Sequence, residues 1–179
     1  MQLKIFSYYV ISSFIYIYEW RKFIFQKRKM NFNQTITAHS SVENAFEAVT
    51  LGIHHWWGNV KNSTITKIND EFSIFFEEGT EWRFRATVFN KFEEVRWECI
   101  YANHRFSKLQ GIKEEWLGTE IVFKFKELNS GTIEVNFEHK GLTPKLNCYE
   151  ICDAGWTHFI STSLKRYLET GKGLPNWVD

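Results

Sequence analysis

Residues Cys148 to Gly171, CYEICDAGWTHFISTSLKRYLETG, decide the fold of this chain. Apolar side chains recur in this stretch every three or four residues, which is the period of an amphipathic α-helix. Gly171 suits the left-handed conformation that commonly ends a helix, and Pro175 cannot continue one. We therefore predict one long helix that begins after Pro144 and ends near Gly171, with a stripe formed by Tyr149, Cys152, Trp156, Phe159, Ile160, Ser163 and Tyr167.

The chain that precedes this helix alternates between apolar and polar side chains. Trp82 and Phe84 face one way, for example, and Arg83 and Arg85 face the other. This two-residue period is typical of antiparallel strands with one face buried and one in water. Asn129-Ser-Gly131 predicts a hairpin turn. We expect strands at residues 32–38, 64–68, 71–77, 81–89, 94–101, 119–127 and 132–139.

A helical segment follows the first strand. Ser40 or Ser41 can cap it, and Val42, Ala45 and Val49 lie on one helical face. Gly52 ends this helix, and residues 53–58 begin a short second helical turn or a loop. The order strand, helix pair, antiparallel strands, long helix predicts an α+β fold. In it, a curved antiparallel sheet of about seven strands wraps around the last helix, the only element large enough to cover its dry face.

Composition indicates a single aromatic-rich domain. The chain has 179 residues, which is long enough to bury a core without disulfides or metals. Aromatic residues make up 18%, with eight Trp and seventeen Phe. Such side chains either line an apolar pocket or simply fill the core, and the sequence leaves both interpretations open.

Charge and cysteine content exclude several classes. Residues 31–179 carry sixteen Lys/Arg and twenty Asp/Glu, a mildly acidic balance that argues against nucleic-acid binding. The three cysteines, Cys99, Cys148 and Cys152, do not form a disulfide framework. Cys148 and Cys152 could share a helix face, but two thiols without a further Cys or His at ligand spacing are a weak metal signal. We predict no metal, no cofactor and a cytoplasmic protein with reduced thiols.

Residues 1–30 form a hydrophobic and basic extension. Its stretch from Ile5 to Tyr18 has fourteen residues without a charge, whereas a membrane-spanning helix needs about 20. Three interpretations stay open: a gene model that starts too early, with Met30 as the initiator, a weak membrane anchor at residues 5–18, or a structural extension. The folded domain is expected to comprise residues 31–179.

Several motifs together resemble the SRPBCC, or START-like, helix-grip superfamily, which is also called Bet v 1-like. Within it, the chain resembles bacterial proteins related to the C-terminal domain of the activator of the heat-shock-protein-90 ATPase. The resemblance covers about residues 31–177. The motifs are SVENAF at 41–46, HWW at 55–57, EWLGT at 115–119, FEHKGLTP at 137–144, GW at 155–156, SLK at 163–165 and GKG at 171–173.

This resemblance implies a seven-stranded antiparallel sheet that grips the long helix, with a cavity between them. Functions in the superfamily include lipid and hormone binding, polyketide cyclisation and stimulation of a chaperone ATPase, so the fold does not deliver a function. Our leading hypothesis is a protein that binds a small hydrophobic ligand (a lipid, an isoprenoid or a polyketide-like molecule) without transforming it. A chaperone cofactor that acts through its surface is the second hypothesis.

Inward-facing aromatic residues are the candidate ligand contacts. Trp56 and Trp57 either form a lid over the cavity mouth or pack the helix pair onto the sheet. The full candidate set is Trp56, Trp57, Trp82, Phe84, Trp97, Tyr101, Trp116, Phe123, Phe125, Phe137, His139, Trp156 and Phe159.

His139 is the one weak catalytic candidate. It is in phase with the inward face of its strand and is either a pocket donor or general base, or a core histidine with satisfied hydrogen bonds. A third hypothesis, a cyclase or hydrolase, would use His139 with Glu115 or Tyr101. Glu115 is alternatively a solvated side chain, and His54 and His55 lack a third ligand for a metal.

Overall fold

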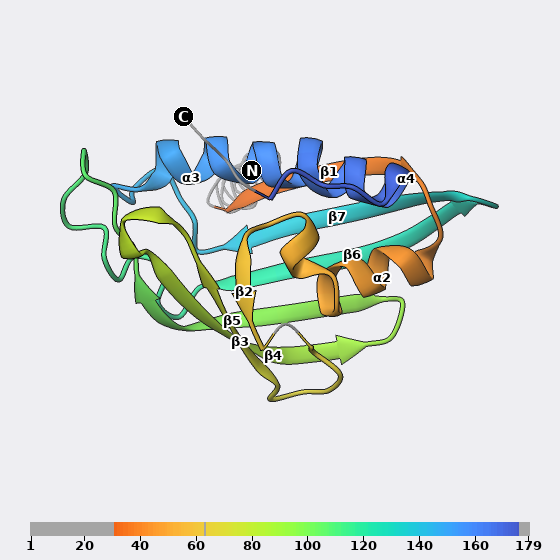
Figure 1. Cartoon of the computed structure of the whole chain (residues 1–179), viewed down its shortest axis with the longest axis horizontal. Helices are drawn as coiled ribbons and strands as arrows, with labels where there is room; N and C mark the ends of the chain where they lie inside the picture. The colour runs from red at the N-terminus through yellow and green to blue at the C-terminus, as the bar shows by residue number, and fades with distance from the viewer. Residues whose placement is uncertain (1–30, 63, 176–179) are drawn as a thin grey trace, which may run out of the picture.

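One sheet and one long helix organise the chain, in a computed structural model that describes residues 31–62 and 64–175. All neighbouring strands are antiparallel, in the order β1-β7-β6-β5-β4-β3-β2. The sheet curves around the C-terminal helix, which confirms the predicted α+β helix-grip fold (Figure 1). The strands are β1 (Phe32–His39), β2 (Asn59–Lys61), β3 (Glu71–Phe75), β4 (Glu81–Asn90), β5 (Glu94–Asn103), β6 (Glu120–Asn129) and β7 (Thr132–Lys140). The expectations for residues 1–30 lie outside the described residues.

The C-terminal helix is continuous over residues 149–170, and its bounds have local causes. It consists of α3 (Tyr149–Trp156), a π-helical segment η3 (Thr157–Leu164) and α4 (Lys165–Thr170). Gly171 ends it with φ of 72°, the left-handed C-cap that was predicted. Its start is later than predicted, because residues 145–148 lie in a turn that the carboxylate of Glu115 holds in place by accepting hydrogen bonds from the backbone N–H groups of Asn147 and Cys148.

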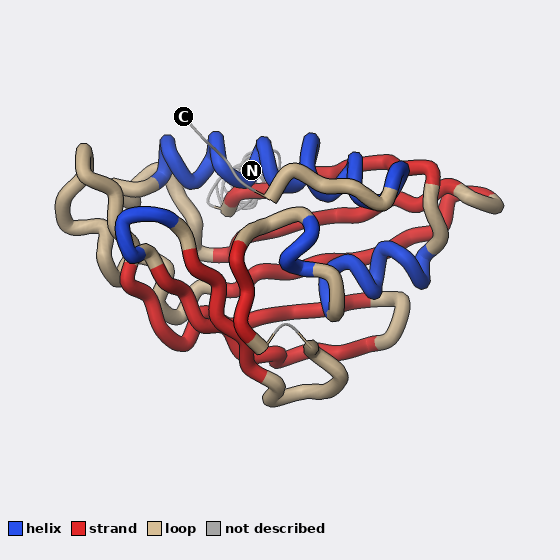
Figure 2. Tube along the Cα trace, in the orientation of Figure 1, coloured by secondary structure: helices blue, strands red, loops and turns tan. Residues whose placement is uncertain are grey.

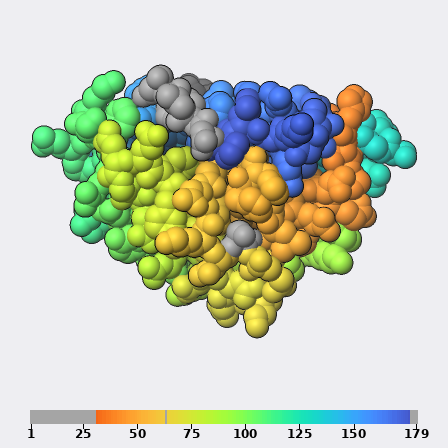
Figure 3. Space-filling model, in the orientation of Figure 1, coloured from red at the N-terminus to blue at the C-terminus, as the bar shows by residue number. Residues whose placement is uncertain are grey.

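Shorter helical elements lie beside the sheet (Figure 2). They are α2 (Val42–Thr50) and the 3-10 turns η1 (Ile53–His55) and η2 (Glu77–Gly79). Ser41 is the N-cap of α2, since its Oγ accepts a hydrogen bond from the backbone N–H of Asn44 at 3.2 Å. In the space-filling view, α2 and the end of the last helix lie side by side (Figure 3). Among the helices of the described residues, none is long and apolar enough to cross a bilayer.

The predicted strand at residues 64–68 is wrong. Asp70 organises this segment as a turn, because its carboxylate accepts bonds from the backbone N–H groups of Thr66 and Lys67 at 2.8 and 3.1 Å. The seventh strand is instead β2, whose three residues are too few to show an alternating pattern.

The predicted inward orientation of Tyr101 is also wrong. Phe84 pairs with Cys99, while the neighbouring Arg83 pairs with Tyr101, so Ile100 is an extra residue in β5. A bulge of this kind shifts the alternation by one position. As a result Ala102 faces the core, and the Tyr101 side chain is 40% exposed on the outer face.

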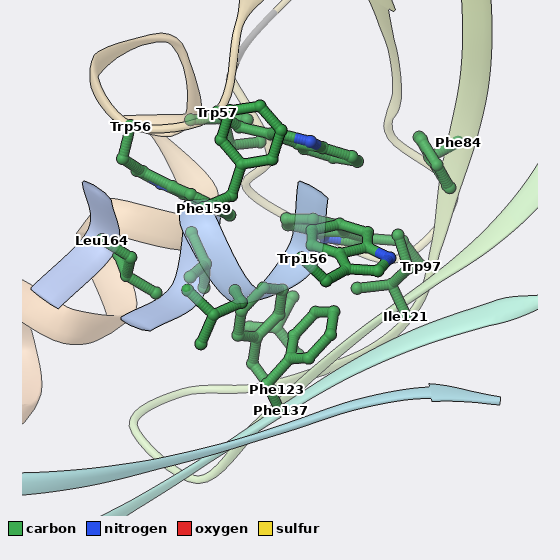
Figure 4. Packing of buried hydrophobic residues seen from close by; sticks show 14 of the residues in the cluster. Trp56, Trp57, Phe84, Trp97, Ile121, Phe123, Phe137, Trp156, Phe159 and Leu164 are labelled. Atoms are coloured by element: carbon green, nitrogen blue, oxygen red, sulfur yellow. The ribbon is translucent and has the colours of Figure 1, made fainter. Parts of the chain in front are cut away.

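The core lies between the concave face of the sheet and the last helix. Figure 4 shows Trp156 of the helix packed near Trp97, Phe123 and Phe137 of the sheet. Ring centroids of Trp156 and Phe137 lie 4.5 Å apart, and those of Trp97 and Phe123 lie 5.1 Å apart. Large aromatic side chains therefore fill most of the space that the helix-grip architecture encloses.

Candidate functional site

A pocket of about 410 Å³ lies at the end of the sheet where α3 begins. The long connection between β5 and β6, seen at the left of Figure 1, contributes one wall, and η2 contributes another. We call it the tryptophan pocket. Its lining residues are Trp57, Phe76, Glu77, Glu78, Thr80, Trp82, His104, Arg105, Phe106, Ser107, Lys108, Trp116, Ile151, Cys152, Gly155, Trp156 and Phe159.

Four tryptophans from four different parts of the chain form the apolar wall. Trp82 of β4 stacks on Trp116 of the β5–β6 connection, with centroids 4.3 Å apart and planes at 19°. Trp116 is in turn parallel to Trp156 of the last helix, at 5.7 Å and 10°. Trp57, which follows η1, lies 4.8 Å from Trp156. The sheet, the connection and the helix thus meet through stacked indole rings.

The structure brings only part of the predicted ligand-contact set to this pocket. Trp57, Trp82, Trp116, Trp156 and Phe159 line it. The remaining inward aromatics lie in the filled core at 9% exposure or less: Trp56, Phe84, Trp97, Phe123, Phe125 and Phe137.

Trp56 and Trp57 have separate environments although they are adjacent. The Trp56 indole N–H donates to the carbonyl of Ala48 in α2 at 2.8 Å, which ties η1 to that helix. Trp57 is 1% exposed and faces the pocket. Trp56 therefore packs the two helical elements together, whereas Trp57 forms part of the pocket wall.

His139 sits at the centre of a directed chain of hydrogen bonds. An indole N–H can only donate, so Nδ1 of His139 accepts from Nε1 of Trp156 at 2.9 Å. The ring proton is then on Nε2, which donates to Oγ1 of Thr119 at 2.9 Å, and this hydroxyl donates to the carbonyl of Trp116 at 2.6 Å. Burial lowers the pKa of His139 to about 3. His139 is therefore a neutral core histidine that orients two of the pocket tryptophans.

The three side chains considered for acid–base catalysis do not meet. His139 is 0% exposed and both of its ring nitrogens are engaged, and Tyr101 lies on the outer face. Glu115 instead accepts bonds from the backbone N–H groups of Asn147 and Cys148, each at 2.8 Å. Burial raises the pKa of Glu115, but these hydrogen bonds outweigh it and the pKa is lowered. Glu115 thus caps the start of the last helix from another loop.

Three polar atoms of the pocket residues are buried without a hydrogen-bond partner in the described part of the chain. They are the indole Nε1 atoms of Trp82 and Trp116 and Nδ1 of His104. Buried donors and acceptors are nearly always paired in folded proteins, so each such atom calls for an explanation. They are half of the six side-chain atoms of this kind in the described residues, and all three belong to residues that line the tryptophan pocket.

His104, Cys148 and Cys152 could hold a metal ion, and sequence reasoning missed this grouping. Their ligand atoms lie within 4.8 Å of one another, and all three residues are buried. Burial lowers the pKa of His104 to about 4, against the opposing effect of the Glu115 charge. His104 lies far from the two cysteines in sequence, and the tertiary fold alone brings it to them.

Comparison with family models supports the fold. The model described as activator of Hsp90 ATPase homolog 1-like protein matches residues 39–169, from the end of β1 into α4. Among proteins of curated function, none gives a significant match.

Solved structures with the same fold include an Aha1 dimer, an HSP90 activator and a protein of a biosynthetic pathway. Aha1 of Colwellia psychrerythraea, solved as a dimer, is 25% identical, with a TM-score of 0.63 over 80% of this chain and 98% of that chain. An HSP90 activator from Plasmodium falciparum is 18% identical, with a TM-score of 0.52 over 74% and 91% of the two chains. The di-domain ARO/CYC protein StfQ of the steffimycin biosynthetic pathway is 13% identical, with a TM-score of 0.57 over 78% and 45%. The last two likenesses concern the fold alone.

Proposed function

The chain belongs to the family of activator of Hsp90 ATPase homolog 1-like proteins, and from this premise we propose that it binds a small, largely apolar ligand in the tryptophan pocket. The ligand class is the one expected from the sequence: a lipid, an isoprenoid or a polyketide-like molecule that is held and not transformed. The di-domain ARO/CYC protein StfQ of the steffimycin biosynthetic pathway shares this fold, but the proposed ligand class rests on the lining of the pocket and not on that likeness.

The observation that carries the proposal is the joining of stacked indoles with unpaired polar atoms in one pocket. A volume of about 410 Å³ falls in the range of ~300–1,000 Å³ that is usual for small-molecule sites. The indole faces favour flat or branched apolar groups. The N–H of Trp82, which lacks a partner in the described residues, favours a ligand with a carbonyl or hydroxyl oxygen, whereas the N–H of Trp116 lies near the thiol of Cys152.

The rim of the pocket does not select a strongly charged molecule. Glu77 and Glu78 of η2 line the pocket together with Arg105 and Lys108 of the β5–β6 connection, so two acidic and two basic side chains border it. Their charges balance, and an apolar body with few polar groups fits this rim better than a phosphorylated compound. The depth of the site is set by Trp57 and Trp156, which are nearly fully buried.

The test combines mass spectrometry with a pocket-blocking variant. Native mass spectrometry of the full chain, followed by denaturing extraction, should reveal a bound apolar molecule. Ile151 lines the pocket on the exposed side of α3, so Ile151→Trp should fill it and weaken binding of an uncharged apolar fluorescent probe such as N-phenyl-1-naphthylamine at least tenfold. Ile151→Leu is the matched control and should bind as the wild type does. An empty protein whose Ile151→Trp variant binds the probe unchanged would contradict the proposal.

A chaperone cofactor is the second candidate, and the family description favours it. The Plasmodium falciparum HSP90 activator shares this fold over 74% of the chain, although the likeness is one of fold. Addition of the purified chain to the Hsp90 of its own organism should then raise the rate of ATP hydrolysis. Unchanged hydrolysis at saturating amounts of the chain would remove this candidate and would leave the pocket proposal intact.

A further inference from the structure

We propose that His104, Cys148 and Cys152 form a Zn²⁺ site in the wall of the tryptophan pocket. His104 follows β5 directly, and the two cysteines lie on the first turn of the last helix. Their three ligand atoms lie within 4.8 Å of one another. Neither ligand binding by the indoles nor contact with a chaperone makes use of this group.

The helix presents its two sulfur atoms on one side. The backbone N–H of Cys152 donates to the carbonyl of Cys148 at 2.9 Å, so the two residues are one helical turn apart. Side chains at this spacing lie on the same face, as do the two helical histidines of many zinc proteases. Glu115 fixes the first of them, because its carboxylate accepts the backbone N–H of Cys148.

His104 supplies an independent observation that points to a ligand. Its side chain is 7% exposed, and its Nδ1 has no hydrogen-bond partner in residues 31–62 and 64–175. The residue is held in place by a bond from its backbone N–H to the carbonyl of Lys113 at 2.9 Å and by the ring of Trp82, 4.9 Å away. A metal bound to the imidazole would give this buried polar group the partner that it lacks.

The donor set selects zinc. Thiolate and imidazole ligands favour Zn²⁺ over Mg²⁺ or Ca²⁺, which prefer oxygen. Binding releases the two thiol protons to solvent, and the two thiolates then offset the two charges of the ion, so the buried site has no net charge. Tetrahedral zinc with bonds of about 2.0–2.3 Å places its ligand atoms about 3.5–3.8 Å apart. Side-chain rotations that move the three ligand atoms by about 1 Å are therefore enough to form the site.

The fourth coordination position faces the tryptophan pocket. Both His104 and Cys152 line that pocket, whereas Cys148 lies behind them at the helix start. Three protein ligands with one open position are the arrangement of zinc sites that bind water or a ligand oxygen. The site itself does not depend on the proposed apolar ligand, because all three donors belong to this chain.

Cobalt titration of the reduced, metal-free full chain tests the site directly. Co²⁺ should bind one ion per chain and give intense visible bands of tetrahedral cobalt with thiolate-to-cobalt charge transfer in the near ultraviolet, and Zn²⁺ should displace it. Cys148→Ser and Cys152→Ser should each lose these bands. Cys99→Ser is the matched control, since Cys99 is equally buried but its thiol donates to the carbonyl of Tyr101 instead.

Thermal unfolding gives a second readout that needs no spectrum. Zn²⁺ should raise the Tm of the wild type and of Cys99→Ser, because an ion that binds the folded state stabilises it. The Tm of Cys152→Ser should not change when Zn²⁺ is added. The proposal would be overturned by cobalt spectra typical of six-coordinate Co²⁺ or by loss of the tetrahedral cobalt bands in Cys99→Ser. It would also be overturned if Zn²⁺ still raised the Tm of Cys152→Ser. Apolar ligand found by mass spectrometry in a protein that fails these tests would refute the zinc site alone.

Discussion

Lowering the pH from 7.5 to 5 should destabilise the fold through His139. The ring is fully buried, and burial lowers its pKa to about 3. Protonation of Nδ1 would also oppose the indole N–H of Trp156, which already points at that atom. In the unfolded chain the same imidazole titrates near 6.5. Because the folded pKa lies below the unfolded one, the contribution is fully present above about pH 6.5 and is lost as the pH falls towards 3.

The size of the effect follows from proton linkage. At pH 5 the unfolded imidazole is almost entirely protonated, whereas the folded ring stays neutral. The difference corresponds to a loss of about 2 kcal/mol in the free energy of unfolding. For a domain of this size, such a loss lowers the midpoint of urea unfolding by about 1 M.

Urea unfolding of the wild type and of His139→Gln at both pH values provides the assay. Glutamine does not titrate, so the variant should lose about 2 kcal/mol less than the wild type between pH 7.5 and 5. All other side chains are the same in the two proteins, so their contributions cancel in this comparison. Equal losses in the two proteins would refute the reasoning. Retention of the Trp156 indole N–H signal in NMR spectra of the wild type at pH 5 is a check that needs no variant.

Three substitutions test other parts of the structure by urea or thermal unfolding. Trp97→Ala should lower the free energy of unfolding by about 3–5 kcal/mol, because the ring is 0% exposed and surrounded by other rings; a loss under 1 kcal/mol would contradict its place in the core. Glu115→Ala should cost about 1–2 kcal/mol, since it removes the acceptor of two N–H groups at the helix start, and Glu115→Gln, which keeps one acceptor oxygen, should cost less. Tyr101→Ser should change stability by only about 0.5 kcal/mol, and a core-sized loss would speak against the bulge in β5.

Local periodicity was enough to predict the large elements of the fold. The stripe of the last helix and its stop at Gly171 survive in the structure, as do the long strands from β4 to β7. The errors arise where a strand is too short to show the apolar–polar alternation or where a bulge shifts that alternation by one residue. Three residues of β2 cannot alternate visibly, and one extra residue, Ile100, reverses the face of Tyr101.

The candidate site was predictable only in its aromatic part. Trp82 and Trp156 could be assigned to the interior because they are in phase with the inward face of a strand and with the stripe of the last helix, whereas Trp116 was a candidate only because its segment could lie over the pocket. The division between pocket wall and filled core depends on how the β5–β6 connection folds over α3, which no periodicity encodes. The same holds for His104, since its nearness to Cys152 arises from tertiary packing.

The open sheet has two edges, and each limits recruitment of a further strand. β2 offers only three residues to an incoming chain. At the opposite edge, the ammonium group of Lys165 on α4 donates to the backbone carbonyl of Thr37 in β1 and so occupies an acceptor there. Exposed edges are where cross-β aggregation begins, and short strands and lysine are common protections against it. A variant that lacks Lys165 should therefore form fibrils more readily than the wild type at high protein concentration.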